Sequence, residues 1–325
     1  MITRPLCDIA GRMIDISRKD ITAAHDRIAG HIRRTPVVEI NFDGIAKPVM
    51  LKLELLQHSG SFKARGAFAN LLTSEPPKAG VTAASGGNHG AAVAFAANAL
   101  GVPAHIFVPE ISSPAKIAKI KAYGAEVTVK GSHYAEALKL CETFETETGA
   151  LSIHAYDAPA TLMGQGTLAK EYEEQAPGID TVLIAVGGGG LIGGIAAWYG
   201  STANIIAVEP RTCPTLHDSL AANERVTITP SGIAADSLGA ASVGEIMFEI
   251  AKQNVGRAVL VDDNDIRTAQ RWLWDKLRLV SEPGGATALA ALLSGAYKPG
   301  PDESIGIVVC GANTDPISFS KAIQQ

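Results

Sequence analysis

Between residues 81 and 154 the sequence alternates between short apolar runs and longer helix-type runs, with only a few residues at each change. The predicted strands cover residues 81–85, 104–108, 126–130 and 151–154. The predicted helices, each followed by a glycine, cover residues 91–100, 114–123 and 132–148. Because strands that alternate with helices over short connections form βαβ units, this pattern predicts an α/β fold with a mostly parallel, twisted sheet flanked by helices.

The rest of the chain shows the same alternation. Before this region we expect a helix at 15–34, a strand at 48–55 and a helix at 64–72. After it, the predicted helices cover 161–175, 191–199, 263–279 (capped by Asp263 and Asn264) and 285–294, and the predicted strands cover 181–186, 205–208, 258–261 and 304–309. Residues 211–244 are expected to be irregular, because they are rich in Thr, Pro, Ser and Gly. A chain of 325 residues predicts about two such domains, with a boundary near residue 155.

The composition limits the class of protein. Hydrophobic residues make up 46% and charged residues 19%, which allows a large core and argues against disorder. A net charge of −5 without a basic block argues against a nucleic-acid-binding surface. The first 20 residues lack the apolar core of a signal peptide. The cysteines have no metal-ligand spacing, which indicates free thiols in the cytoplasm, and they are Cys7, Cys141, Cys213 and Cys310.

Residues 181–208 carry no charge and are long enough to cross a membrane. However, this run contains Gly187 to Gly190, and then Gly193 and Gly194. Each glycine in a helix interior costs about 1 kcal/mol relative to alanine. We therefore expect a strand, a loop and a buried helix here, and no membrane segment.

Lys63 lies in a run of small residues at the junction between a predicted strand and a predicted helix. A desolvated lysine has a lowered pKa, and its neutral amine can attack a carbonyl carbon. The alternative is a helix N-terminus with serine caps and two solvated cations, Lys63 and Arg65. By itself this stretch favours the cap, because caps are common. The choice between a nucleophilic lysine and a capped helix end therefore depends on the other motifs.

The stretch Gly187–Gly190 joins a predicted strand to a predicted helix, where successive glycine amides can bind a phosphate. Gly188, Gly190 and Gly193 also match the dinucleotide pattern G-x-G-x-x-G, and Glu209 follows where a ribose-binding acid would lie. A nicotinamide-dependent oxidoreductase is therefore one candidate. A dehydrogenase has no use for a nucleophilic lysine, whereas pyridoxal phosphate needs both the lysine and the phosphate-binding amides.

Five motifs occur in order along the chain, at residues 61–67, 87–90, 164–167, 186–194 and 311–313. Together they resemble the fold-type II pyridoxal phosphate enzymes, which share the fold of tryptophan synthase beta, and among them the serine/threonine dehydratase (ammonia-lyase) and serine racemase family. The resemblance covers nearly the whole chain. It implies a large cofactor-binding domain of residues 1–67 and 156–325, and a small, mobile substrate-binding domain of residues 68–155. It also implies a homodimer that acts on a small amino acid.

The resemblance assigns roles to individual residues. Lys63 would carry the cofactor covalently and, as the catalytic base, take the Cα proton of the substrate. The other implied cofactor-binding residues are Phe62 against the ring, Asn88 at the ring hydroxyl, Cys310 at the pyridine nitrogen, and Gly187, Gly188, Gly189, Gly190 and Leu191 at the phosphate. The implied substrate-binding residues, whose amides would bind the carboxylate, are Ser85, Gly86, Gly87, Asn88 and His89.

Cys310 adds a chemical argument. A neutral thiol cannot stabilise a protonated pyridine as a carboxylate would, so the ring withdraws electrons less strongly. This favours elimination, in which loss of a β-hydroxyl discharges the negative charge at Cα. We therefore expect a lyase that converts L-threonine, L-serine or both into 2-oxobutanoate or pyruvate plus ammonia. Serine racemase and 3-hydroxyaspartate dehydratase of the same family, and a binding protein without catalysis, are alternatives.

Three departures from the family pattern bear on this expectation. Gly86 stands where serine racemases have a serine that acts as a second base, so we expect weak racemisation. Glu209 matches an acid of a family cation site, for a monovalent or divalent ion, but Thr215 stands where the second acid would be. Residues 231–236 also differ from the usual Ala-Asp-Gly run.

Four further positions can be compared with the family pattern. Ala64 stands where cysteine and threonine synthases usually carry an aspartate, which argues against those relatives. His154, Asp157 and Glu282 match family positions and are expected to be mainly structural. Asp157 is also a candidate substrate-side residue.

Overall fold

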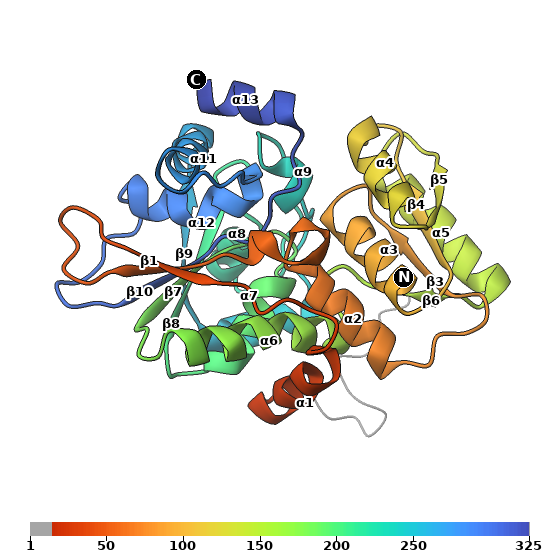
Figure 1. Ribbon diagram of the computed structural model, residues 1–325, viewed down its shortest axis with the longest axis horizontal. Coiled ribbons are helices and arrows are strands. Elements are labelled where there is room, and N and C mark those ends of the chain that lie inside the picture. Colours follow the sequence, from red (N-terminus) through yellow and green to blue (C-terminus); the bar gives the residue numbers. More distant parts are fainter. Residues whose placement is uncertain (1–14, 325) are drawn as a thin grey trace.

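The computed structural model describes residues 15–324. Cys7 and most of the first 20 residues, for which we predict no signal peptide, lie outside the described residues. The described strands form a six-stranded sheet with the order β1-β2-β10-β7-β8-β9 and a four-stranded sheet with the order β5-β4-β3-β6 (Figure 1). The strands are β1 Val37–Ile40, β2 Val49–Lys52, β3 Val81–Ala84, β4 Ala104–Val108, β5 Glu126–Val129, β6 Leu151–Ser152, β7 Thr181–Ala185, β8 Asn204–Pro210, β9 Val255–Val261 and β10 Ile305–Val308.

In the large sheet only β1 is antiparallel to its neighbour, and all other pairs are parallel. Strand β7 is buried along its whole length, because helices cover both faces of the sheet. On one face lie α6 (Pro159–Gln175) and α7 (Gly190–Tyr199), and on the other lie α11 (Asp263–Leu277) and α12 (Pro283–Leu293) (Figure 1). The predicted parallel sheet with flanking helices is confirmed.

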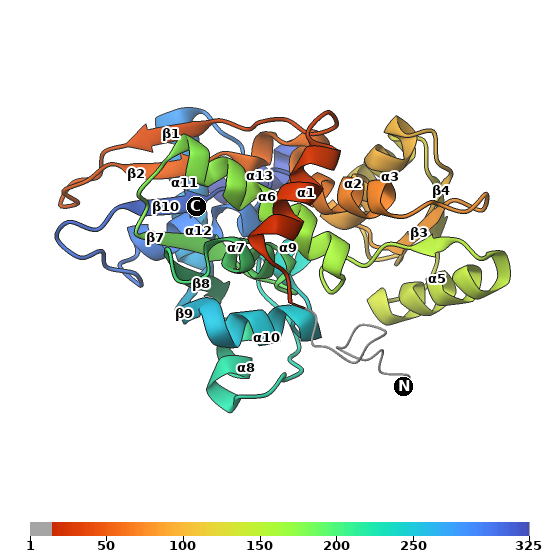
Figure 2. The same ribbon diagram turned by 90° about the horizontal axis from the view of Figure 1, so that it is seen from below.

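The small sheet is parallel throughout. The alanine-rich helix α3 (Asn88–Ala99) packs on one face, and α5 (Tyr134–Thr148) packs on the other (Figure 2). Helix α4 (Pro114–Ala122) lies beside α3, and α2 (Lys63–Thr73) contacts both α3 and α6. Helix α2 therefore joins the two sheets.

The remaining helices are α1 (Arg18–Ile28), α8 (Thr215–Ala222), α9 (Ala235–Leu238), α10 (Glu245–Asn254) and α13 (Pro316–Gln324), with 3-10 turns at Glu54–Leu56 and His58–Gly60. The expectation that residues 211–244 are irregular was wrong, since α8 and α9 lie there. The first predicted helix is shorter than 15–34, and the strand predicted at 48–55 turns into a 3-10 helix after Lys52. The cap of α11 is Asp262, with a capping box to Asp265, and not Asp263.

No helix among residues 15–324 is long and apolar enough to cross a membrane. The uncharged run 181–208 forms β7, the glycine turn, α7 and most of β8, as its glycines indicated.

Candidate active site

Four loops meet where parallel strands of the two sheets end. They follow β2, β3, β7 and β10, and they carry Lys63, Asn88, Gly187 and Cys310 respectively. Because ligands of open α/β sheets bind outside the carboxyl ends of the strands, this is the expected place for a site. One cavity lies there, which we call the active-site cavity, lined by Phe62, Lys63, Tyr156, Ala185, Gly187–Gly190, Leu191, Ser237, Leu238 and Cys310.

Lys63 reaches this cavity because the loop before α2 is bound to the chain beyond β10. The Phe62 N–H donates to the Cys310 carbonyl oxygen at 3.1 Å, and the Ala312 N–H donates to Gly60 at 2.9 Å. The Lys63 Nζ donates to the Ala155 carbonyl oxygen at 2.7 Å and lies 5.1 Å from the Phe62 ring centre. Burial lowers the pKa of Lys63 to about 8, although nearby Cys310 raises it slightly.

The start of α2 is not a serine-capped, solvated end. Its N-cap is Phe62, without a side-chain hydrogen bond. Arg65 is fully buried and binds both Glu54 and Glu171, with its Nε 2.5 Å from Glu54 Oε1 and its Nη2 2.9 Å from Glu171 Oε2. Lys52 is buried against the same Glu171 at 2.5 Å. The alternative of two solvated cations was therefore wrong for Arg65.

The glycine loop, residues 187–190, has the geometry of an anion site. Among the described residues, no protein atom accepts the N–H groups of Gly187, Gly188 or Gly189, which precede the N-terminus of α7. Gly189 has a φ of +88°, where L side chains are strained. A Cβ on Gly188 would lie 2.3 Å from the Tyr156 ring. Cβ atoms on Gly188 and Gly190 would collide with Tyr156, and a Cβ on Gly189 would lie 2.3 Å from Met247 Cε, so the packing requires glycine at these positions.

Cys310 faces the cavity from the end of β10. It is 4% exposed, and its Sγ lies 3.5 Å from the Gly284 carbonyl oxygen, to which it donates. Burial raises the pKa of this thiol well above its usual range, so it stays neutral at physiological pH.

Asn88 begins α3 and connects the two sheets. Its Nδ2 donates to Glu282 Oε1 at 2.6 Å, and its Oδ1 accepts from Asn313 Nδ2 at 2.5 Å. Burial raises the pKa of Glu282 to about 7 and outweighs the lowering by Asn88. Sequence reasoning expected Glu282 to be mainly structural and did not connect it with Asn88. No sequence signal links two residues that are 194 positions apart.

The loop of residues 85–89 is tightly packed. Its Ser85 N–H donates to Phe107, and a Cβ on Gly86 would lie 2.0 Å from Ser112 Oγ. The Gly87 N–H donates to Ser85 Oγ at 3.2 Å. His89 is 6% exposed, its Nε2 lies 2.7 Å from the Ile153 carbonyl oxygen, and burial lowers its pKa to about 3. The ring is therefore neutral, and it serves to hold α3 against the end of β6.

Tyr156 lines the cavity against the glycine loop and was missed by sequence reasoning. Its neighbours on the chain have structural contacts. His154 Nδ1 accepts from the Asp157 N–H at 2.8 Å. Both oxygens of Asp157 accept backbone N–H groups at the start of α10, from Glu245 at 2.8 Å and Ile246 at 3.0 Å. The Asp157 carboxylate thus caps a helix.

Glu209 caps α8 in a similar way. It is fully buried, and it accepts from Leu216 N–H at 2.8 Å, His217 N–H at 2.7 Å and Thr215 Oγ1 at 3.0 Å. Burial raises the pKa of Glu209 to about 7, although these hydrogen bonds oppose the shift. Within residues 15–324, no group of three or more His, Cys, Asp or Glu side chains is placed to hold a metal ion.

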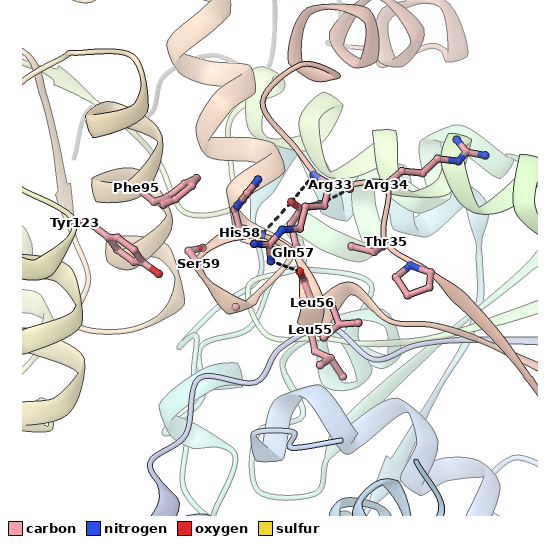
Figure 3. A pocket seen from close by; sticks show the side chains of 12 residues that line it. Arg33, Arg34, Thr35, Leu55, Leu56, Gln57, His58, Ser59, Phe95 and Tyr123 are labelled. Atoms are coloured by element: carbon pink, nitrogen blue, oxygen red, sulfur yellow. Dashed lines mark hydrogen bonds between the residues drawn. The ribbon is translucent and has the colours of Figure 1, made fainter. Parts of the chain in front are cut away.

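A second cavity, of about 530 Å³, lies between the loops around Arg33 and His58 on one side and Phe95 of α3 and Tyr123 at the end of α4 on the other (Figure 3). His58 stacks on Phe95 with ring centres 4.8 Å apart, and Arg33 donates to the Leu56 carbonyl oxygen at 2.8 Å. None of the predicted catalytic, cofactor-binding or substrate-binding residues lines it.

The residues of the active-site cavity fit pyridoxal phosphate. The free amides of the glycine loop suit its phosphate, and the Lys63 amine suits its aldehyde. The neutral Cys310 thiol suits an unprotonated ring nitrogen, and Phe62 and Tyr156 supply apolar walls. These groups come from four separate parts of the chain and converge on one cavity.

Comparison with known proteins agrees with this fit. Residues 28–311 match the protein family described as pyridoxal-phosphate dependent enzyme. The chain is 38% identical over 308 residues to the phenylserine dehydratase of Ralstonia pickettii, which covers 93% of this chain and 94% of that protein. It is 35% identical over 313 residues to the L-threonine ammonia-lyase of Geobacter sulfurreducens, which covers 94% of this chain and 77% of that protein.

Two solved structures are similar to this chain over nearly its whole length. Maize serine racemase matches with a TM-score of 0.89 at 32% identity, covering 96% of this chain and 98% of that one. A threonine deaminase from T.th. matches with a TM-score of 0.87 at 37% identity, covering 92% of this chain and 99% of that one.

Proposed function

Because the chain belongs to the pyridoxal-phosphate dependent enzyme family, we propose that it is a lyase that eliminates water from a β-hydroxy-α-amino acid, with L-threonine, L-serine or both as substrates. The supporting observation is the convergence of the Lys63 amine, the glycine-loop amides and the neutral Cys310 thiol on one cavity. The similarity to a phenylserine dehydratase adds phenylserine to the substrates to be tested.

When bound, pyridoxal phosphate withdraws electrons from Cα of an attached amino acid and makes that C–H bond acidic. Lys63 is the only lysine that lines the active-site cavity in the described part of the chain, and its lowered pKa suits a general base. It takes the Cα proton; the electrons of that bond form Cα=Cβ, and the β-hydroxyl leaves with a proton as water. One water is then taken up as ammonia leaves, so threonine yields 2-oxobutanoate and ammonia.

The test combines absorbance with product analysis. Purified protein loaded with pyridoxal phosphate should show a yellow band that borohydride bleaches, and Lys63→Ala should lose both the band and the activity. Lys121→Ala, on the exposed side of α4, is the matched control. L-threonine, L-serine and phenylserine are then assayed for ammonia and oxo acid. A bleachable band with no product from any of them would favour the binding protein without catalysis.

Serine racemase is the second candidate, because maize serine racemase matches nearly the whole chain. Gly86 argues against it, since a glycine supplies no base on the second face of Cα. Quantifying D-serine against pyruvate after incubation with L-serine separates the two activities. D-serine formed at a rate comparable to pyruvate would establish the racemase.

The contacts of Glu209 argue against the nicotinamide oxidoreductase. That alternative needs Glu209 to bind a ribose, whereas its two oxygens accept from Thr215, Leu216 and His217 inside the protein. The matching family also uses a different cofactor.

We further propose that residues 1–67 with 156–325, and residues 68–155, are the two domains, and that the protein is a cytoplasmic homodimer. The strand segments of the two sheets support the division. The free thiols of Cys141, Cys213 and Cys310 support a reducing compartment. The dimer rests on family resemblance, and light scattering should give twice the 33.8 kDa chain mass.

A further inference from the structure

Four polar side chains form a continuous hydrogen-bonded series across the junction of the two sheets. The Lys119 Nζ donates to Asn313 Oδ1, Asn313 Nδ2 donates to Asn88 Oδ1, and Asn88 Nδ2 donates to Glu282 Oε1. We call this series the relay. Lys119 and Asn88 belong to helices on the small sheet, whereas Asn313 and Glu282 follow β10 and precede α12.

The two ends of the relay determine its direction. An ammonium group can only donate hydrogen bonds, and an ionised carboxylate can only accept them. Each carboxamide between them has one donor side and one acceptor side. With Lys119 at one end and an ionised Glu282 at the other, only one orientation of Asn313 and Asn88 satisfies every contact. The Ser59 carbonyl oxygen reinforces it by accepting from Lys119 Nζ at 3.0 Å and Asn313 Nδ2 at 2.9 Å.

We propose that Glu282 is a positioning residue: through the relay it holds the Asn88 carboxamide with its NH₂ group as a hydrogen-bond donor for the oxygen of the cofactor ring. An NH₂ group carries two hydrogens, and Glu282 uses one, so the second remains for a ligand. This inference rests on the proposed function, because it assigns Asn88 to the cofactor.

Protonation of Glu282 would weaken this orientation. A neutral carboxyl can donate to Asn88 Oδ1 as well as accept, so Glu282 no longer selects one orientation of the carboxamide, and only the contact with Asn313 still does. Burial raises the pKa of Glu282 to about 7. The charged and titratable groups that face Glu282 are Lys116 and Lys119 from α4, Asp236 from α9, and Cys310 after β10. The two lysines oppose protonation and Asp236 favours it, while the neutral thiol adds no charge.

The test measures the affinity for pyridoxal phosphate, by equilibrium dialysis between pH 6 and 9, in wild type, Glu282→Gln and Lys119→Met. Loss of one oriented hydrogen bond to a buried group corresponds to roughly tenfold in affinity. We expect each variant to bind about tenfold more weakly above pH 8. Because Lys63 titrates in wild type and variants alike, the effect of Glu282 is read from the ratio of wild-type to Glu282→Gln affinity, which should fall below pH 7. The ratio isolates Glu282 because the glutamine of Glu282→Gln does not titrate, whereas Lys63 is unchanged. Glu224→Gln and Lys121→Met, both at exposed positions, are matched controls.

The double variant separates orientation from plain packing. If both residues act through one relay, Glu282→Gln with Lys119→Met should bind about as weakly as either single variant. Additive losses, or a ratio of wild-type to Glu282→Gln affinity that stays constant with pH, would overturn the proposal. Lys119 is half-buried, so Lys119→Met keeps the test open if Glu282→Gln fails to fold.

A measurement on the cofactor-free protein is independent of the loaded enzyme. With ¹⁵N-asparagine labelling, the side-chain amide signals of Asn88 and Asn313 should shift with pH around a common midpoint near 7, and should not do so in Glu282→Gln. Signals that stay constant would contradict the relay. A wild-type protein with no bleachable yellow band would refute the cofactor assignment itself, whereas a normal band with unchanged affinity in both variants refutes only the relay.

Discussion

Lys63 shows how one residue obtains its chemistry from contacts that are distant in sequence. Its amine is desolvated by the loop before α2, the chain after β10 and the segment around Ala155. Desolvation disfavours the ammonium form, which lowers the pKa from the usual 10.5 to about 8. At neutral pH a far larger fraction of this amine is nucleophilic than of a surface lysine.

We therefore expect the pH dependence of cofactor binding to report this pKa. The rate at which cofactor-free protein becomes yellow with pyridoxal phosphate should rise about tenfold per pH unit and level off near pH 8. The rate of N-acetyl-lysine, measured in parallel, should keep rising to about pH 10, so the ratio of the two rates should fall above pH 8. Stopped-flow absorbance gives the rates. A ratio that stays constant up to pH 10 would mean that Lys63 titrates as an exposed lysine.

Packing of the loop requires a glycine at position 86. A Cβ there would lie 2.0 Å from Ser112 Oγ and 2.9 Å from Val108 Cγ1. We expect Gly86→Ala to lower the unfolding free energy by about 1–3 kcal/mol, and Ser112→Gly to restore much of it. Urea unfolding measures both, with Gly30→Ala as control, because nothing lies within 4 Å of a Cβ at Gly30. Equal stability of Gly86→Ala and wild type would show that Ser112 moves freely.

Substitutions at the same two positions, 86 and 112, test whether the protein can act as a racemase. Gly86→Ser by itself is expected to strain the loop, whereas Gly86→Ser with Ser112→Gly places a hydroxyl on the loop without that collision. We expect D-serine formation to increase in the double variant relative to wild type. No increase in a folded, yellow double variant would mean that a hydroxyl at position 86 is not sufficient for the second base.

At the scale of elements, two helix termini are capped by carboxylates from other parts of the chain. Glu209, at the end of β8, satisfies the first N–H groups of α8, and Asp157 does the same for α10. These contacts hold the helices against the large sheet.

The raised pKa of Glu209 predicts that the difference in stability between wild type and Glu209→Gln depends on pH. Its folded pKa, about 7, is raised above the unfolded value, so its stabilising contribution is full at low pH and is lost as the pH rises through 7. Relative to Glu209→Gln, which does not titrate, wild type should lose about 2 kcal/mol of unfolding free energy between pH 5 and 8. Urea unfolding of both proteins at each pH measures this. Parallel profiles would show that Glu209 stays ionised.

The buried ion cluster around Arg65 holds the start of α2. Removing one member of a buried ion pair leaves an uncompensated charge. We expect Arg65→Met to lower the unfolding free energy by about 3–5 kcal/mol, because Glu54 and Glu171 would then face only Lys52. Arg34→Met, which breaks an exposed pair with Glu174, should cost less than about 1 kcal/mol. Similar losses in the two variants would contradict this.

At the scale of the whole molecule, the two sheets have separate apolar cores. The core beneath α3 is composed largely of alanine and is smaller than the core of the six-stranded sheet. Helix α4 contacts the half of the molecule that contains the large sheet through two lysines. Lys116 forms an ion pair with Asp236, and Lys119 donates to Asn313. The small sheet is thus attached mainly through α2 and polar contacts, which suits relative motion of the two halves.

Hydrogen exchange should show this difference. We expect amides of β4 to exchange at a lower opening free energy than amides of β8, and cofactor binding to slow exchange in α4. Mass spectrometry of peptides from each strand measures both. Identical opening free energies would indicate one cooperative unit, against the proposed domain division.

Much of this protein was determined by its sequence. The alternation of apolar and helical runs predicted both parallel sheets, and Gly187–Gly190 predicted a turn between a strand and a helix. These are local properties, because periodicity, glycine content and strand length act over a few residues. The roles of Lys63 and of this turn toward a cofactor stay predictions. The helix α8 was not predicted, because its stabilising acceptor, Glu209, precedes the helix and binds it only after folding.

Only the tertiary structure decided which distant residues meet. The order β2-β10-β7 places Lys63, Cys310 and the glycine loop side by side, and no local pattern encodes the neighbour of a strand. The tertiary structure also joins Asn88 to Glu282 and Lys119 to Asn313, across the junction of the two sheets. Burial at these junctions shifts the pKa values of Lys63 and Glu282, because desolvation depends on everything that surrounds a charge.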